Sequence, residues 1–108
     1  MRPNEEKLRR LTLNHTERVL HPAFISLDAR TLAMIELALL IAVDGPTSAF
    51  ETAASAAIAA GATDDELVEV LIVTAPTVGN AHVVAAAPKL ALALGYDVEA
   101  ALETLTLD

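Results

Sequence analysis

The chain has 108 residues, a formal net charge of −8 and no cysteine. This length fits one domain with a single core, and the acidic balance is the wrong sign for binding a nucleic-acid backbone or an anionic membrane surface. Without cysteine, these residues can form neither disulfides nor thiolate nucleophiles nor thiolate metal sites.

Hydrophobic residues make up 54% of the chain, but aromatic residues only 3%. The apolar mass is therefore mostly alanine, leucine, valine and isoleucine, which bury little area each and leave apolar surface on a lone domain. We expect a homo-oligomer. The longest strongly apolar run, residues 37–43, is too short for a bilayer span of about 20 residues, and the charged N-terminus does not have the apolar stretch of a secretory signal. These features predict a cytoplasmic protein.

We expect one domain over residues 1–108, made of an N-terminal arm or short helix over residues 1–26 and a helical core over residues 27–105. Leu8 and Leu11 lie three residues apart, as on one side of a helix. No segment of any length alternates polar and apolar residues as a half-buried strand would. The sequence therefore predicts an all-α fold, a compact helical bundle.

Start and stop signals place the first two helices of the core. Asp28 can cap a helix over about residues 29–43, which is apolar almost all round and is therefore expected to be buried. Residues 48–51 fit the Ser-x-x-Glu capping box at the head of a helix that reaches Ala60, with Gly61 at the C′ position.

A second capping box, Thr63 with Glu66, starts a helix that we expect to end at about Thr74. Proline lacks the backbone N–H that a helix interior uses, so Pro76 and Pro88 are expected to separate helices. The remaining helices are predicted over residues 77–87, 89–94 and 98–105, the last capped by Asp97.

Three segments of the sequence together resemble one protein family. In chain order they are LDARTLAMIELALLIAVDG, AASAAIAAGATDDELVEVLIVTAPTVG and AAAPKLALALGYDVEAAL, within residues 27–104. They are similar to the carboxymuconolactone decarboxylase family, most specifically in the Ala-Gly at residues 60–61 followed by Thr63, an acidic pair and Glu66. The resemblance implies the alkylhydroperoxidase D-like all-helical fold and a homo-oligomer, commonly a trimer or hexamer, with sites near subunit contacts.

The reactive residues of that family are missing from the matching positions. Peroxidase-type members carry Cys-x-x-Cys-x-x-x-His on the helix that ends at the Ala-Gly, and these three residues fall on Pro46, Ala49 and Ala53. Decarboxylase-type members tend to have the same histidine, and many members have a glutamate where Ala33 stands. The chain thus resembles a member whose reactive helix face is replaced by Pro46, Ala49, Ala53, Ala56 and Ala60.

Glu36 and His82 are the candidate catalytic residues that remain. Glu36 is the only charged residue in 31–43 and lies one turn beyond Ala33, among leucines, so we expect it to act as a general acid or base. The alternative is a structural ion pair with Arg30 or with an arginine of another subunit. His82 is expected to serve as a proton partner or substrate ligand, with a structural hydrogen-bonded histidine as the alternative.

Four residues are candidates for contacts with a small apolar or carboxylate-bearing ligand. Asp44 and Thr47 lie in the loop that enters the reactive helix of the resembled family, although an Asp before Gly-Pro is first a turn residue. Ala49 and Ala53 are expected to line the apolar side of the same pocket. The three histidines show no spacing typical of a metal site, and we expect neither a metal nor a cofactor.

Two hypotheses about function follow from these residues. The first is a non-redox small-molecule enzyme of decarboxylase or lactone type, with Glu36 and His82 as acid–base groups in an apolar pocket near a subunit interface. The second is a family member that has lost its chemistry and serves as a ligand-binding or structural oligomer. A pocket that holds Glu36 without a basic partner favours the first, and an alanine-lined helix contact that fills this space favours the second.

Overall fold

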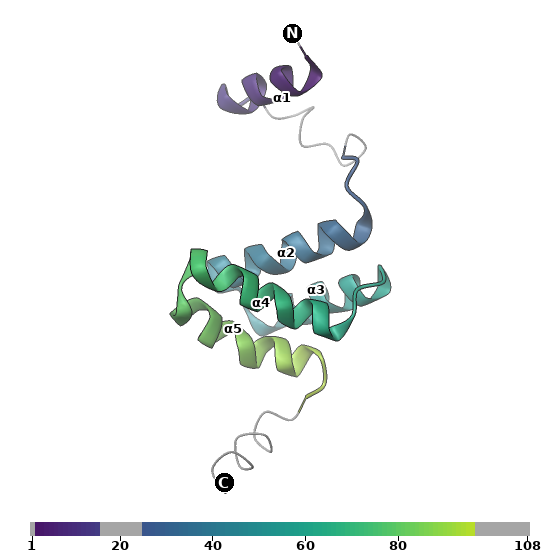
Figure 1. Ribbon diagram of the computed structural model, residues 1–108, viewed down its shortest axis with the longest axis vertical. Helices are drawn as coiled ribbons and strands as arrows, with labels where there is room; N and C mark the ends of the chain where they lie inside the picture. The colour runs from purple at the N-terminus through teal and green to yellow at the C-terminus, as the bar shows by residue number, and fades with distance from the viewer. Residues whose placement is uncertain (1, 16–24, 97–108) are drawn as a thin grey trace, which may run out of the picture.

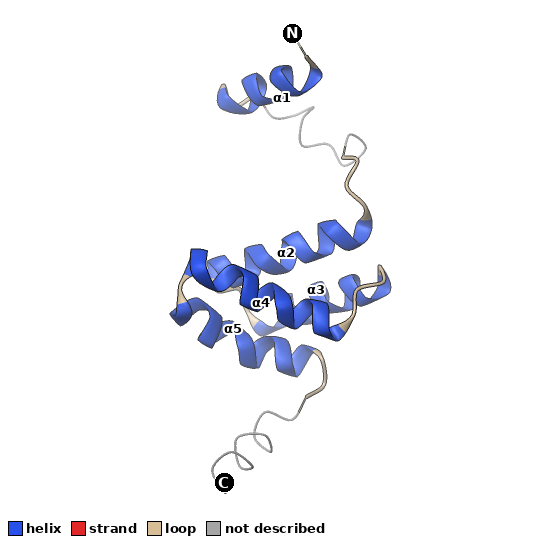
Figure 2. Ribbon diagram, viewed as in Figure 1, coloured by secondary structure: helices blue, strands red, loops and turns tan. Residues whose placement is uncertain are grey.

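The structure, a computed structural model, describes residues 2–15 and 25–96, and every regular element in this part of the chain is helical (Figure 1, Figure 2). The helices are α1 (Pro3–Thr12), α2 (Ala29–Val43), α3 (Thr47–Ala59), α4 (Asp64–Val78) and α5 (Asn80–Ala93). The all-α prediction is confirmed. The helix predicted over residues 98–105, with Asp97 as its cap, lies outside the described residues.

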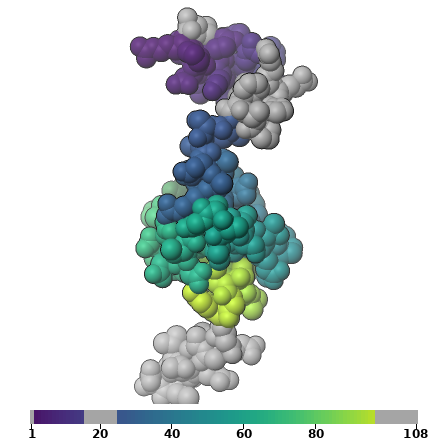
Figure 3. Space-filling model, turned by 90° about the vertical axis from the view of Figure 1, so that its right-hand side faces the viewer, coloured from purple at the N-terminus to yellow at the C-terminus, as the bar shows by residue number. Residues whose placement is uncertain are grey.

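Helices α2 to α5 form one packed bundle, in which α2 and α5 each contact both α3 and α4. Every helix of the bundle supplies at least one side chain to its fully buried centre. These side chains are Leu37 and Ile41 from α2, Phe50 from α3, Leu67 from α4 and Leu90 from α5. Helix α1 is not part of this packing and stands apart from the bundle in Figure 1 and Figure 3.

Helix α2 begins and ends where its sequence predicts. The Asp28 carboxylate accepts a hydrogen bond from the Thr31 N–H at 2.7 Å, which confirms the predicted cap. At the other end, Asp44 adopts a left-handed backbone with a φ of 55°, and the Gly45 N–H donates to the Leu40 carbonyl at 2.9 Å. This bond satisfies a carbonyl that would otherwise have no partner at the helix end.

The prediction that α2 is buried all round is wrong for the single chain. Ala33, Leu37 and Ile41 form a buried inner face, but Leu39 and Val43 are 58% and 71% exposed. Within the described residues, α2 packs mainly against α3 and α4, with a smaller contact to α5. These neighbours cover only part of its circumference, so the apolar residues on the outer face stay open to solvent.

The capping box predicted at Ser48 and Glu51 is also wrong. Pro46 is the N-cap, with an extended ψ of 160°, and Thr47 is already the first helical residue. Ser48 therefore lies inside the first turn, where its carbonyl accepts a hydrogen bond from the Thr52 hydroxyl at 3.1 Å. Proline cannot donate a backbone hydrogen bond and its φ is fixed near the helical value, so the helix begins directly after it.

The C-terminal end of α3 and the start of α4 follow the sequence closely. Gly61 has a φ of 100° at the C′ position, and the Ala62 N–H donates to the Ala57 carbonyl at 2.9 Å, as in a Schellman motif. The capping box of Thr63 and Glu66 is confirmed, because each residue's backbone N–H donates to the other's side chain, at 3.0 and 3.1 Å.

The helix boundaries predicted at the two prolines are wrong. Helix α4 continues through Pro76 to Val78, and α5 runs through Pro88 without interruption. Both prolines are exposed, so the carbonyls that they leave without a helical partner lie on the solvent side. The buried face of α5 continues across the proline from Ala86 to Leu90, and this packing stabilises the helix through it.

Candidate functional site

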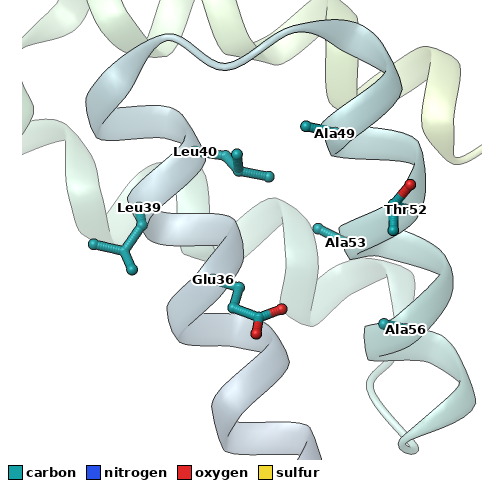
Figure 4. A pocket seen from close by; sticks show the side chains of 7 residues that line it. All are labelled: Glu36, Leu39, Leu40, Ala49, Thr52, Ala53 and Ala56. Atoms are coloured by element: carbon teal, nitrogen blue, oxygen red, sulfur yellow. The ribbon is translucent and has the colours of Figure 1, made fainter. Parts of the chain in front are cut away.

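A pocket of about 480 Å³ lies between α2 and α3, and we name it the α2–α3 pocket (Figure 4). Its lining residues come from one face of each helix: Glu36, Leu39, Leu40, Ala49, Thr52, Ala53 and Ala56. The structure therefore brings together three of the residues singled out from the sequence, which are Glu36, Ala49 and Ala53. A volume of this size is in the range of small-molecule binding sites.

Among the described residues, Glu36 is the only charged one that lines the α2–α3 pocket, and its carboxylate points toward α3 in Figure 4. No basic residue is among the lining residues, and Arg30 forms its salt bridge with Glu66 of α4. The alternative of a Glu36–Arg30 ion pair is thus wrong. Glu36 is exposed in the single chain, whereas Ala33, one turn earlier, is buried in the core. Position 33 of α2 thus faces the core, whereas position 36, three residues later, faces the pocket.

The α3 side of the pocket is a wall of alanines. Ala49, Ala53 and Ala56 direct their methyl groups toward α2 in Figure 4, one turn after another. The Thr52 hydroxyl, which also lines the pocket, donates to the Ser48 carbonyl of its own helix. The wall therefore presents almost only methyl groups to an occupant.

A second, smaller hollow of about 190 Å³ is lined by Asp44, Ala81, His82 and Ala85. We name it the Asp44–His82 pocket. The Nδ1 atom of His82 is buried and has no hydrogen-bond partner among the described residues. In the single chain the two candidate catalytic residues thus line different pockets, Glu36 the first and His82 the second. Thr47 is half-buried in the first turn of α3 and is not among the lining residues of either pocket.

Lys89 is a residue of this region that the sequence reasoning missed. Its Nζ donates to the Asp44 Oδ1 and to the Gly45 carbonyl, both at 2.8 Å, and lies 5.9 Å from the centre of the Phe50 ring. The hydrogen bond from Lys89, followed by the charge of the same group, holds the pKa of Asp44 below its ordinary value. A signal was available, because Lys89 is the only lysine or arginine between residues 31 and 96.

The sequence matches the carboxymuconolactone decarboxylase family over residues 7–92, about four fifths of the chain. The chain belongs to this family. No curated protein and no solved structure shows a significant match to it. Within residues 2–15 and 25–96, no helix has the length and hydropathy that would let it cross a membrane.

In this member of the carboxymuconolactone decarboxylase family, the positions implied by the resemblance fall on and around one pocket. Ala49, Ala53 and Ala56 line the α2–α3 pocket, while Pro46 and Ala60 are the two caps of α3. The 108 residues contain no cysteine, so they hold no thiols for peroxidase chemistry. The polar side chains that line the α2–α3 pocket, among the described residues, are those of Glu36 and Thr52.

Proposed function

We propose that this family member is a non-redox small-molecule enzyme that uses Glu36 as its acid–base group in the α2–α3 pocket. The observation that carries the proposal is the composition of that pocket, which combines one carboxylate, without a basic partner among the described residues, with a lining that is apolar apart from Thr52. A carboxylate held against an apolar occupant is suited to take a proton from a carbon or oxygen atom of that occupant and to return it.

The lining also indicates the class of substrate. No lysine, arginine or histidine of the described residues lines the α2–α3 pocket, so the part of the substrate against the alanine wall is apolar, with a carbonyl or lactone group next to Glu36 and any carboxylate at the open, solvent side. In a decarboxylase reaction the bond between the carbon and its carboxylate breaks, CO₂ leaves, and Glu36 passes to that carbon a proton taken up from water. In a lactone-type reaction the carboxylate takes a proton beside the carbonyl and returns it. We also place this pocket near a subunit interface, because Leu39 at its edge is largely exposed.

The test is turnover of carboxymuconolactone and of a panel of neutral lactones by the wild-type chain and by Glu36→Gln. We expect the variant to lose activity by about a hundredfold or more, because general acid–base catalysis contributes on this scale. Glutamine keeps the size and the hydrogen-bonding capacity of the side chain, so binding of the same compound, followed by NMR titration, should change much less.

Two further variants complete this experiment. Glu51→Gln changes an exposed carboxylate that does not line the pocket, and it should retain full activity. Ala56→Phe adds a large side chain at an exposed position of the pocket wall, and it should abolish binding while the helical circular-dichroism signal is retained. Full turnover by Glu36→Gln would refute the proposal. Binding in the pocket without turnover of any compound would instead favour the ligand-binding alternative.

A further inference from the structure

A second groove, of about 450 Å³, lies between α2 and α4 on another side of α2. We name it the α2–α4 groove. Its apolar floor and edges come from both helices and include Met34, Ile35, Ala38, Val70 and Val73. Val73 and Ile35 are 75% and 42% exposed, so the groove presents apolar side chains to its surroundings.

The charges at the α2–α4 groove are negative. Glu66 and Glu69 of α4 both line it. Glu66 is already paired with Arg30, but Glu69 has no salt bridge with any of the described residues. Over residues 25–96 the bundle carries eight carboxylates against two cations, a formal net charge of −6. An apolar occupant with a positive flank would therefore be attracted to this groove.

Helix α1 has the properties of such an occupant. Leu8 and Leu11 are 63% and 41% exposed, three residues apart on one side of the helix, and α1 packs against no helix of the bundle. Lys7 lies about 40° round the helix from Leu11 and flanks this apolar side. Over residues 2–15 the chain carries four cations against two carboxylates, a formal net charge of +2.

Three of the other four charges of α1 lie away from the leucines, and the fourth, Glu5, lies about 60° round the helix from Leu8, on the side opposite to Lys7. Glu6 forms salt bridges with Arg9 and Arg10 at 2.9 and 2.8 Å, on the opposite side of the helix. These pairs stabilise α1 internally, and they leave Lys7 as the cation beside the apolar side. An isolated helix of ten residues is marginal in water, so a partner for its leucines would stabilise α1 substantially.

We propose that α1 of one copy of the chain docks in the α2–α4 groove of a second copy, with Leu8 and Leu11 on its apolar floor and Lys7 beside Glu69. This is the helix-in-groove mode of recognition. Each copy carries one such helix and one such groove, and α1 stands apart from its own bundle (Figure 1, Figure 3). An exchange of α1 between copies, reciprocal in a pair or head-to-tail round a closed ring, therefore covers both exposed apolar surfaces on every copy.

The test uses introduced cysteines, which report cleanly because the chain has none of its own. Leu11→Cys is mixed with a size-tagged Val73→Cys chain, the mixture is oxidised, and the mixed dimer is followed on a non-reducing gel. The matched control pairs Leu11→Cys with Val84→Cys, a valine on α5 that is 71% exposed and does not line the groove. We expect Val73→Cys to cross-link at least about tenfold faster than the control, because docking raises the local concentration of the two thiols.

Further variants test the contact between Lys7 and Glu69, and whether α1 docks on a second copy or on its own bundle. Lys7→Glu in the Leu11→Cys chain should slow the cross-link, and Glu69→Lys in the Val73→Cys chain should restore it. Equal cross-linking rates for Val73→Cys and Val84→Cys would overturn the proposal. A chain carrying both Leu11→Cys and Val73→Cys that closes only a disulfide within itself, at monomer mass, would also overturn it, because α1 would then occupy its own groove.

Discussion

Lys89 connects α5, through hydrogen bonds, to the turn between α2 and α3. Its ammonium group binds the Asp44 carboxylate and the Gly45 carbonyl, and Asp44 itself holds the left-handed position that ends α2. This turn separates the two pockets, because Leu40 before it lines the α2–α3 pocket and Asp44 lines the other. A single cation thus connects α5 to the end of α2.

We expect Asp44→Asn to lower the stability of the protein at neutral pH and to flatten its pH dependence in acid. The pKa of Asp44 is lowered in the folded state, mainly by the hydrogen bond from Lys89. The unfolded chain therefore binds more protons than the folded chain between the two pKa values. The stabilisation is present above the unfolded value of about 3.8 and is lost as the pH falls through the folded value. Asparagine tolerates the left-handed backbone, so the substitution removes only the charge.

Urea unfolding at pH 7, 5 and 3, followed by circular dichroism, measures this effect. Glu51→Gln is the matched control, since Glu51 is exposed and forms no salt bridge with the described residues. If wild type and Asp44→Asn lost stability equally between pH 5 and pH 3, the Asp44–Lys89 pair would contribute nothing to folding.

Residue spacing within one helix predicted which side chains line the candidate pocket. Contacts between helices that are distant in sequence could not be predicted in this way. The positions of Ala49, Ala53 and Glu36 follow from helical periodicity on two consecutive helices, so their meeting at one pocket was predictable. The separation of His82 from Glu36 depends on how α5 is rotated against the bundle, which no local pattern contains. The role of Lys89 also depends on a contact across 45 residues of sequence.

At the scale of the element, the capping box of Thr63 and Glu66 defines the start of α4. We expect Thr63→Ala to destabilise the protein by about 1 kcal/mol, because the Glu66 N–H loses its acceptor. Thr63→Ser is the control and should retain most of the stability, since serine offers the same hydroxyl. Thermal unfolding followed by circular dichroism compares the three proteins, and an equal loss in both variants would show that the cap hydroxyl does not matter.

The starts of helices that carry a polar cap residue, and the ends of helices that carry a glycine, were predictable. The residues that form the capping hydrogen bonds are close together in the sequence. Asp28, Thr63 and Gly61 all occupy the predicted cap positions. The error at Ser48 arose because the neighbouring Pro46 takes the cap position, whereas the errors at the two later prolines arose where tertiary packing overrides a local preference. Pro76 and Pro88 lie inside helices whose buried faces continue across them, so a rule that holds for an isolated helix failed in the bundle.

At the scale of the whole molecule, exposed apolar side chains are present on all five helices, Leu8, Leu39, Ile58, Ile72 and Leu92 among them. We therefore predict a homo-oligomer, a trimer or hexamer, because a monomer would leave these surfaces in water. Light scattering after gel filtration should give a multiple of the chain mass of 11.3 kDa. A species of one chain mass at micromolar concentration would contradict the prediction. Leu8→Glu changes α1 alone, so the mass of this variant shows how far the oligomer depends on the α1 contact and how far on the other apolar surfaces.

The alanine wall of the α2–α3 pocket has no rotamers. Ala49, Ala53 and Ala56 carry only a methyl group each, so an occupant that packs against α3 restricts no side-chain torsion there and meets a surface that cannot reshape itself. Adjustment to the shape of an occupant falls mainly on the opposite wall, where Leu39 and Glu36 are exposed and have rotatable torsions, while Leu40 packs against the core. The pocket therefore has a wall of methyl groups on α3 and adaptable side chains on α2, and its one carboxylate among the described residues lies on the adaptable side.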